Sequence, residues 1–104
     1  MGTPTDSASQ HREIWEFKLY INGETFDNRQ VESKLRKLCE HYLGEKFRLQ
    51  TLDINDEKII FPEDLLAVPT IIRLHPLPER RVIGNLSSRQ RAVEGLGLQE
   101  FGDW

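Results

Sequence analysis

Pro69 stands directly before a run of β-branched and aliphatic residues, and this junction constrains the fold of the chain more than any other feature. Proline disfavours helical backbone in the residue that precedes it, so an element before Pro69 is expected to end at Val68. Residues 71–74 then predict a strand, and the proline-rich residues 76–79 predict a turn that folds the chain back onto residues 81–83. We therefore expect an antiparallel strand pair that begins just after Pro69.

A strand–helix–strand unit is predicted upstream of this pair. Residues 15–21 alternate between apolar and polar side chains, which is the period of a strand with one buried face. Residues 47–54 predict a second strand, and because a helix separates the two, parallel pairing through a right-handed crossover is expected. The helix between them is predicted from Asp27 as N-cap, with Gln30 completing a capping box, to Gly44 as the C-terminal glycine. Its apolar stripe comprises Val31, Leu35, Leu38, Cys39 and Tyr42.

Two further helices are predicted with weaker local signals. Pro62 fits the first turn of a short helix over residues 62–67. Ser87 with Gln90 repeats the capping-box pattern and predicts a last helix, whose core-facing residues are Ala92, Val93 and Leu96.

The end of this last helix is ambiguous because Gly95 and Gly97 both fall in it. Each glycine costs roughly 0.5–1 kcal/mol relative to alanine in a helix interior. One interpretation is a helix that ends near Gly95 with a glycine cap. The other is a segment poised between two conformations, since residues 92–98 also alternate well enough to form an edge strand.

The predicted order β-α-β-α-β-β-α, with proline just before the third strand, is that of the thioredoxin core, so the expected fold class is thioredoxin-like α/β. In that fold this proline is usually cis, which the sequence alone leaves open. Thioredoxin chemistry needs a Cys-x-x-Cys motif at the start of the first helix, and residues 23–28 contain no cysteine. Cys39, the single cysteine, falls within the apolar stripe and is expected to be a small core residue. Redox catalysis is therefore not expected.

The length and composition of the chain limit the number of domains and the classes of partner that are expected. The chain has 104 residues, and we expect one domain over residues 14–98, preceded by a disordered arm over 1–13 and followed by a tail over 99–104. A net charge of −3 argues against a nucleic-acid partner. No membrane partner is expected, because no run of 18 apolar residues and no signal-peptide pattern occurs. The single cysteine fits a cytoplasmic protein.

No catalytic, metal or cofactor site is expected. The three histidines, His11, His41 and His75, have no ligand spacing, and no glycine-rich phosphate loop occurs. A carboxylate site from Asp53 and its neighbours is conceivable, but a solvated loop at the end of a strand explains these acids better.

Charge is distributed unevenly along the second half of the chain. Residues 53–64 hold five acids against Lys58, whereas residues 73–91 hold five arginines against Glu79. Such a polarity could orient the protein on a partner, although scattered solvated charge would give the same count. Arginine pairs well with carboxylates at interfaces, so the predicted partner-binding residues are Arg73, Arg80 and Arg81.

Residues 67–98 closely resemble the circadian clock protein family KaiB. That family has the pattern Ala-Thr-Pro-Thr, a proline-containing turn, Arg, Gly-Asp-Leu-Ser, Arg and Gly-Leu-Asp-Leu. This chain reads Ala-Val-Pro-Thr at 67–70, Gly-Asn-Leu-Ser at 84–87 and Gly-Leu-Gly-Leu at 95–98, so Asn85 and Gly97 replace two aspartates. The strand at 18–23 matches more loosely, and the resemblance covers about residues 15–98.

The resemblance implies a non-enzymatic regulator that binds the ring-shaped ATPase KaiC in a thioredoxin-like state, in a circadian, timing or stress system. It also implies a second fold in which the C-terminal half rearranges and the protein self-associates as dimers or tetramers. A fold-switching pair needs two packings within a few kcal/mol of each other. The residues expected to govern the switch are Val68, Pro69, Gly84, Asn85, Gly95 and Gly97.

Two alternatives stand beside this hypothesis. The first is a thioredoxin-fold thiol enzyme that uses Cys39. The second is the sensory domain of a KaiC-binding histidine kinase, which is less expected because the sequence contains no kinase region.

Overall fold

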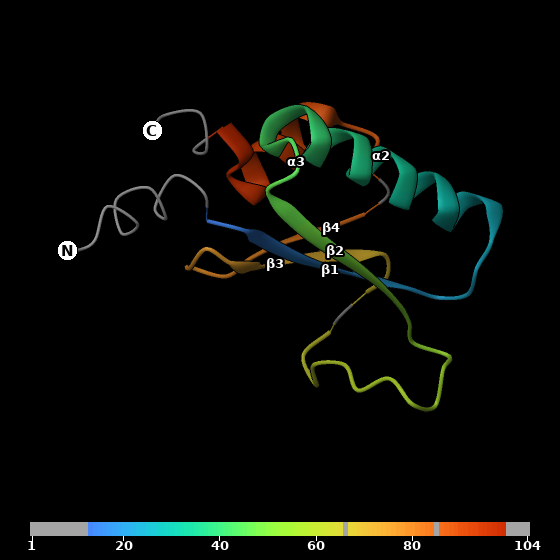
Figure 1. Cartoon of the computed structure of the whole chain (residues 1–104). Helices are drawn as coiled ribbons and strands as arrows, with labels where there is room; N and C mark the ends of the chain where they lie inside the picture. The colour runs from blue at the N-terminus through green and yellow to red at the C-terminus, as the bar shows by residue number, and fades with distance from the viewer. Residues whose placement is uncertain (1–12, 66, 85, 100–104) are drawn as a thin grey trace.

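A computed structural model describes residues 13–65, 67–84 and 86–99. The predicted arm and tail lie outside these residues, except for Glu13 and Gln99. The described chain forms one four-stranded sheet with the strand order β2-β1-β3-β4, and both helices cover the same face of it (Figure 1). The elements are β1 (Trp15–Ile21), α2 (Phe26–Leu43), β2 (Phe47–Asp53), β3 (Thr70–His75), β4 (Arg80–Ile83) and α3 (Arg89–Leu96).

The central strand β1 forms as its alternation predicts. Its odd-numbered residues from Trp15 to Ile21 are buried in the main core beneath the helices, whereas Tyr20 is buried on the opposite face. β1 pairs with β2 in parallel and with β3 antiparallel, as expected for the crossover and the hairpin. The main core therefore lies between the sheet and the two helices.

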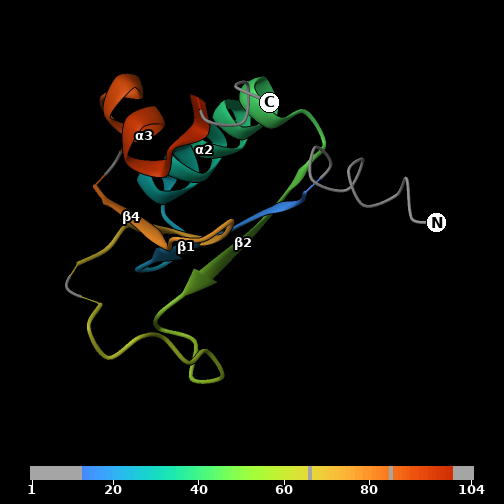
Figure 2. The ribbon, with the colours of Figure 1, turned by 90° about the vertical axis from the view of Figure 1, so that its left-hand side faces the viewer.

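The opposite face of the sheet is covered differently. Tyr20, Leu52 and Ile72 form a small second core there, against which the segment between β2 and β3 packs. Figure 2 shows this segment lying across the sheet from α2 and α3.

Helix α2 confirms the predicted stripe and C-terminus, but not the N-cap. The cap is Thr25, whose hydroxyl oxygen accepts a hydrogen bond from the Asn28 amide at 3.1 Å, so the predicted cap Asp27 lies inside the first turn. At the other end Gly44 has φ +63°, and its amide donates to the Glu40 carbonyl oxygen at 3.0 Å.

The prediction of a short helix over residues 62–67 is wrong. Residues 63–64 form a turn, with the Leu65 amide donating to the Pro62 carbonyl oxygen at 3.1 Å. A single helical turn fixes many dihedral angles for one hydrogen bond, and Pro69 prevents the turn from extending. The described residues therefore contain no helix between β2 and β3.

The strand pair after Pro69 is confirmed, with β3 and β4 antiparallel in the register Thr70↔Ile83 to Arg73↔Arg80. The Val68–Pro69 bond is cis, as are the bonds before Pro76 and Pro78.

The last helix, α3, also confirms the prediction in outline. Ala92, Val93 and Leu96 are buried as expected, but the cap is Ser88 rather than Ser87. The Ser88 hydroxyl oxygen accepts from the Arg91 amide at 3.2 Å. The interpretation of a helix that ends near Gly95 with a glycine cap is confirmed, because α3 ends at Leu96 and Gly97, with φ +67°, is the left-handed cap residue.

Candidate functional site

In a thioredoxin-like fold the redox motif stands at the start of the first helix, opposite the proline that precedes the third strand. Here a cavity occupies that place, and no cysteine lines it. A cavity of about 420 Å³ lies between the first turns of α2 and Pro69. Its lining comprises Asp27, Asn28, Gln30, Val31, Lys34 and Pro69, none of which is a thiol. The proline and the helix start are thus juxtaposed as in a redox fold, but the site offers no group for disulfide exchange.

Cys39 does not replace that missing thiol. Its side chain is fully buried in the main core, and burial raises the pKa of the thiol from 9.0 to about 12. The reactive species is the thiolate, which is scarce at neutral pH when the pKa is so high. Cys39 therefore serves as a core residue, which agrees with its place on the apolar stripe.

The described residues also do not meet the requirements of a metal site or of a membrane-spanning helix. Among them no group of three or more His, Cys, Asp and Glu side chains is placed to hold a metal ion. His75 pairs with Glu13, with 2.6 Å between Nε2 and Oε2. Within the same described part, neither helix combines the length and apolarity needed to cross a membrane.

The predicted partner-binding residue Arg73 points into the protein. Its side chain is 1% exposed, Nη1 donates to the Leu96 carbonyl oxygen at 2.8 Å, and Nη2 donates to the Pro78 carbonyl oxygen at 3.0 Å. Its guanidinium carbon lies 4.9 Å from the centroid of the Trp15 ring, within cation–π range. In this conformation Arg73 links β3 to the end of α3 and to the hairpin turn.

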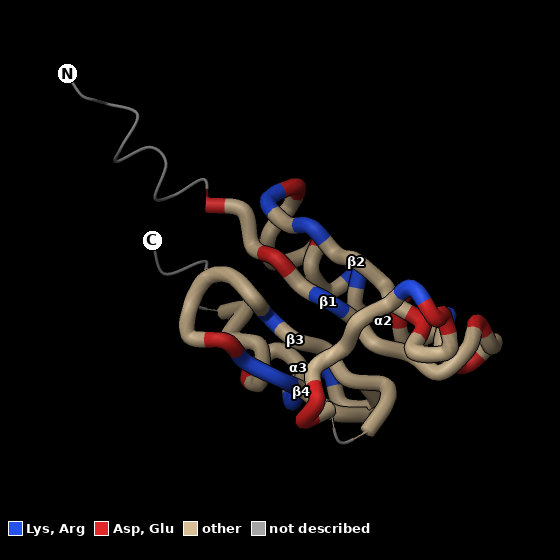
Figure 3. Tube along the Cα trace, turned by 90° about the horizontal axis from the view of Figure 1, so that it is seen from below, with Lys and Arg blue, Asp and Glu red and all other residues tan. Residues whose placement is uncertain are grey.

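Arg81 lies at the surface of β4 and is held by two acids. Its Nε is 3.0 Å from Glu79 Oε2, and its Nη1 is 3.2 Å from Asp64 Oδ1. The hydrogen bond to Glu79 raises the pKa of the guanidinium, which therefore stays charged. Glu79 directly precedes the basic pair Arg80-Arg81 at the start of β4 (Figure 3). The acidic and basic segments thus meet at this point rather than forming two separate poles.

The predicted switch residues fall in two places. Pro69 and Gly84 stand at the open end of the hairpin, where the Gly84 amide donates to the Pro69 carbonyl oxygen at 2.9 Å. Gly95 lies inside α3 against Val82 of β4, and Gly97 ends that helix. Val68 is half-buried beside the second core, and Asn85 lies outside the described residues.

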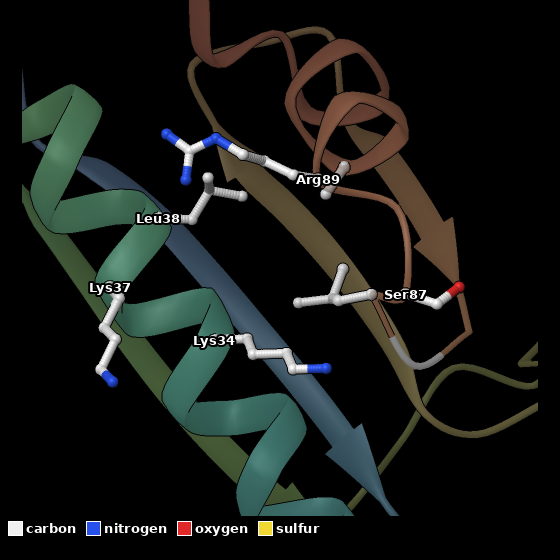
Figure 4. Close-up of a pocket in the computed structure, with 7 residues that line it drawn as sticks. Lys34, Lys37, Leu38, Ser87 and Arg89 are labelled. Carbon is white, nitrogen blue, oxygen red and sulfur yellow. The ribbon is translucent and has the colours of Figure 1, made fainter.

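Sequence reasoning missed two features. One is the Asp64–Arg81 contact, which joins residues 17 apart and depends on how the segment before β3 turns. The other is a cavity of about 330 Å³ between α2 and the start of α3 (Figure 4). The only sequence signal for that cavity was the placement of Lys34 and Lys37 beside the apolar stripe.

The fold and this site define a thioredoxin-like domain without redox cysteines. Chloroplastic thioredoxin z superposes with a TM-score of 0.60 at 14% identity, covering 99% of this chain and 91% of that one. The thioredoxin Deadhead from Drosophila melanogaster gives a TM-score of 0.58 at 11% identity, covering 89% and 88%. At such identities the likeness concerns the fold alone.

Within that class the chain belongs to the KaiB family. The family model described as the KaiB domain matches residues 18–98. The circadian clock oscillator protein KaiB of Synechococcus sp. (strain RCC307) is 36% identical over 89 residues, covering 84% of this chain and 80% of the relative. The protein of the same name from Prochlorococcus marinus (strain MIT 9312) is 33% identical over 88 residues, covering 84% of each chain. The resemblance inferred from residues 67–98 is thereby confirmed.

Proposed function

We propose that this protein is a non-enzymatic regulator that binds a KaiC-type ATPase ring and modulates its phosphorylation or ATPase state in a circadian, timing or stress system. The observation that carries the proposal is the KaiB match over residues 18–98, with relatives named as clock oscillator proteins. The absence of a thiol beside Pro69 and the burial of Cys39 support a binding role over a redox role. A cytoplasmic location agrees with that role.

The surface proposed for the partner is the β3–β4 hairpin with Arg80 and Arg81. The two side chains lie on opposite faces of β4: Arg81 is on the face turned away from the helices, whereas Arg80 is half-buried on the helix-covered face that Val82 shares. Arg81 keeps about a third of its side chain exposed, while Glu79 and Asp64 fix the orientation of its guanidinium. A partner carboxylate would meet a preoriented donor, which reduces the ordering entropy lost on binding. Arg73 is buried, so we assign it an indirect part through the hairpin that it holds in place.

We further propose that the C-terminal half has a second conformation in which the protein self-associates as a dimer or tetramer. Two observations support this. Residues 92–98 alternate between apolar and other positions, and α3 holds a glycine in its last turn and another as its cap. In the proposed rearrangement the hinges are Val68, Pro69, Gly84, Asn85, Gly95 and Gly97.

Binding of the purified protein to its cognate KaiC-type ATPase tests the main proposal. The ring-shaped ATPase is immobilised with ATP, with ADP or without nucleotide. Binding is followed by biolayer interferometry for at least several hours, because slow switching between the two conformations would delay it. Saturable binding in at least one nucleotide state is expected. Absence of binding in every state at micromolar concentrations would overturn the proposal.

A further inference from the structure

The turn between β1 and α2 contains a dipeptide whose chemistry the proposed clock function does not use. Asn22 is followed by Gly23, and it is the only asparagine of the chain that precedes a glycine. Because β1 and β2 are parallel, they end at the same edge of the sheet, and this turn lies beside the end of β2 (Figure 1). Asn22 is exposed and Gly23 is half-buried, so water reaches the dipeptide.

An asparagine that precedes a glycine can modify itself. The glycine nitrogen loses its proton and attacks the side-chain carbonyl carbon of the asparagine. A new C–N bond closes a succinimide ring, and the side-chain nitrogen takes up a proton and leaves as ammonia. Water then adds to either ring carbonyl group and reopens the ring to aspartate or isoaspartate. The net reaction consumes water and releases ammonia, and glycine favours it because no side chain hinders the attacking nitrogen.

The fold requires the glycine of this dipeptide. Gly23 has φ +88°, a backbone conformation that side chains other than glycine rarely adopt. Asn22 also has a structural part, because its Oδ1 atom accepts a hydrogen bond from Asn55 Nδ2 at 2.7 Å. The reactive dipeptide is therefore part of the turn that joins β1 to α2.

Two contacts in the described conformation oppose the reaction. The Gly23 amide donates to Asp53 Oδ1 at 3.0 Å, which retains the proton that has to leave, and the carboxylate repels the nitrogen anion that attack requires. The bond from Asn55 Nδ2 restrains the Asn22 side chain, which has to rotate towards the Gly23 nitrogen. Asp53 Oδ1 also accepts from the Asn55 amide at 2.9 Å, so one carboxylate oxygen supports both restraints.

We propose that Asn22–Gly23 is a spontaneous deamidation site that Asp53 and Asn55 keep unreactive in the described conformation. Local opening of the β1–α2 turn releases both restraints and allows the ring to close. An isoaspartate at position 22 lengthens the backbone just before α2, where Asn28 Nδ2 donates to the Asn22 and Gly23 carbonyl oxygens at 3.1 and 2.7 Å. Deamidation therefore loosens the start of α2 irreversibly. The proposal is independent of the proposed clock function.

Peptide mapping by mass spectrometry measures the reaction at each asparagine of the whole chain. The protein is incubated at about pH 8 in its native state and in urea, and aspartate and isoaspartate at position 22 are followed with time. We expect Asn22 to react at least about tenfold more slowly in the native state than in urea. Equal rates in the two states would overturn the proposal, as would a rate in urea no faster at Asn22 than at Asn28.

A pair of carboxylate variants tests the part of Asp53. Asp53→Ala should raise the native rate at Asn22 at least about fivefold, relative to the rate of the same variant in urea. Asp56→Ala is the matched control, because Asp56 Oδ1 accepts from the Lys58 amide at 2.9 Å and not from the dipeptide. The control should change the rate less than about twofold, and equal acceleration by both variants would contradict the proposed protection.

Two further variants separate this protection from global stability. Asn55→Ala removes the restraint on the Asn22 side chain at an exposed position and should raise the native rate at least about twofold. Arg73→Met removes hydrogen bonds to α3 and to the hairpin turn, so it tests global unfolding alone. Native rates that follow only the urea-measured stability of these variants would contradict the proposal. Circular dichroism shows that each variant is folded.

Discussion

Arg73 Nη1 donates a hydrogen bond to the Leu96 carbonyl oxygen at 2.8 Å, across 23 residues of sequence. This bond attaches the last turn of α3 to the central part of the sheet. A second bond from Nη2 to the Pro78 carbonyl oxygen attaches the hairpin turn to the same guanidinium. One buried side chain thus connects the elements that the proposed rearrangement would separate.

Replacing Arg73 should therefore destabilise the described conformation. Arg73→Met keeps most of the volume but leaves two carbonyl groups without their charged donor, so we expect a loss of about 3 kcal/mol in the free energy of unfolding. Arg73→Lys should recover only part of it, because an ammonium cannot span both acceptors in the same geometry. Urea unfolding followed by circular dichroism measures both.

The exposed Arg91 provides the control for that series. Arg91→Met should change stability by less than about 0.5 kcal/mol. If Arg73→Met costs no more than this control, the guanidinium does not hold the two segments together.

Because Gly95 lies against Val82, we expect substitutions at these two positions to have coupled effects on the free energy of unfolding. A Cβ atom added at Gly95 would lie 2.5 Å from Val82 Cγ2, and valine is stiff about χ1. Overpacking costs about 1–3 kcal/mol, against a helix-propensity gain of about 1 kcal/mol. We expect Gly95→Ala to destabilise the described fold and Val82→Ala to relieve part of the loss in the double variant.

A double-mutant cycle from chemical denaturation measures this coupling. The expected interaction term is favourable by at least about 0.5 kcal/mol. Strictly additive effects would show that α3 does not pack against β4 as described. A Gly95→Ala variant that becomes oligomeric instead would support the proposed second conformation.

The buried Cys39 predicts a pH dependence of stability. Because burial raises the pKa of the thiol to about 12, the folded protein keeps the proton above pH 9, where the unfolded chain releases it. The free energy of unfolding should therefore fall as pH rises above about 9, with a contribution approaching about 1.4 kcal/mol per pH unit. Burial also raises the pKa of Tyr20 and adds a fall of the same sign.

The variant Cys39→Ala shows how much of the fall in the free energy of unfolding above about pH 9 comes from the thiol. Between pH 8 and 10.5 the slope of stability against pH should be shallower in the variant than in the wild type. In the native wild type, labelling by a thiol reagent at pH 7 should be as slow as global or local opening. Rapid native labelling would contradict the burial and reopen the thiol-enzyme alternative.

Because Arg81 lies at the surface, we expect its substitution to weaken partner binding while leaving the free energy of unfolding almost unchanged. Its contacts with Glu79 and Asp64 are exposed ion pairs, so Arg81→Gln should change stability by less than about 1 kcal/mol. The same variant should weaken binding to a KaiC-type ATPase by at least about tenfold if Arg81 contacts it. Arg91→Gln is the matched control, and equal weakening by both variants would argue for a non-specific charge effect.

The sequence predicted those elements whose signal is periodic. The alternation of residues 15–21 and the stripe from Val31 to Leu38 indicated β1 and α2, and proline at 69 indicated where β3 begins. The predicted N-caps were displaced because two candidate capping residues stand close together at each helix start, Thr25 and Asp27 at α2 and Ser87 and Ser88 at α3. At α2 a local hydrogen bond accompanies the Thr25 cap: Asn28 Nδ2 donates to the Gly23 carbonyl oxygen at 2.7 Å, where the chain enters the helix.

The candidate site was less predictable because its contacts join distant residues. Arg73 occupies a strand position where a charged side chain is expected at the surface, yet its acceptors are carbonyl groups supplied by the hairpin turn and by α3. No local sequence pattern predicts that these carbonyl groups will lie next to Arg73. The cavity beside Lys34 likewise exists only where α3 packs next to α2.

The proposed function requires that the protein bind its ATPase partner in the thioredoxin-like conformation. NMR secondary shifts of residues 69–98, recorded for the isotope-labelled protein free and bound to an unlabelled KaiC-type ATPase or its N-terminal ring, test this claim directly. Helical shifts at 89–96 and strand shifts at 70–75 and 80–83 are expected in the bound state. Strand shifts at 89–96 in the bound protein would contradict it.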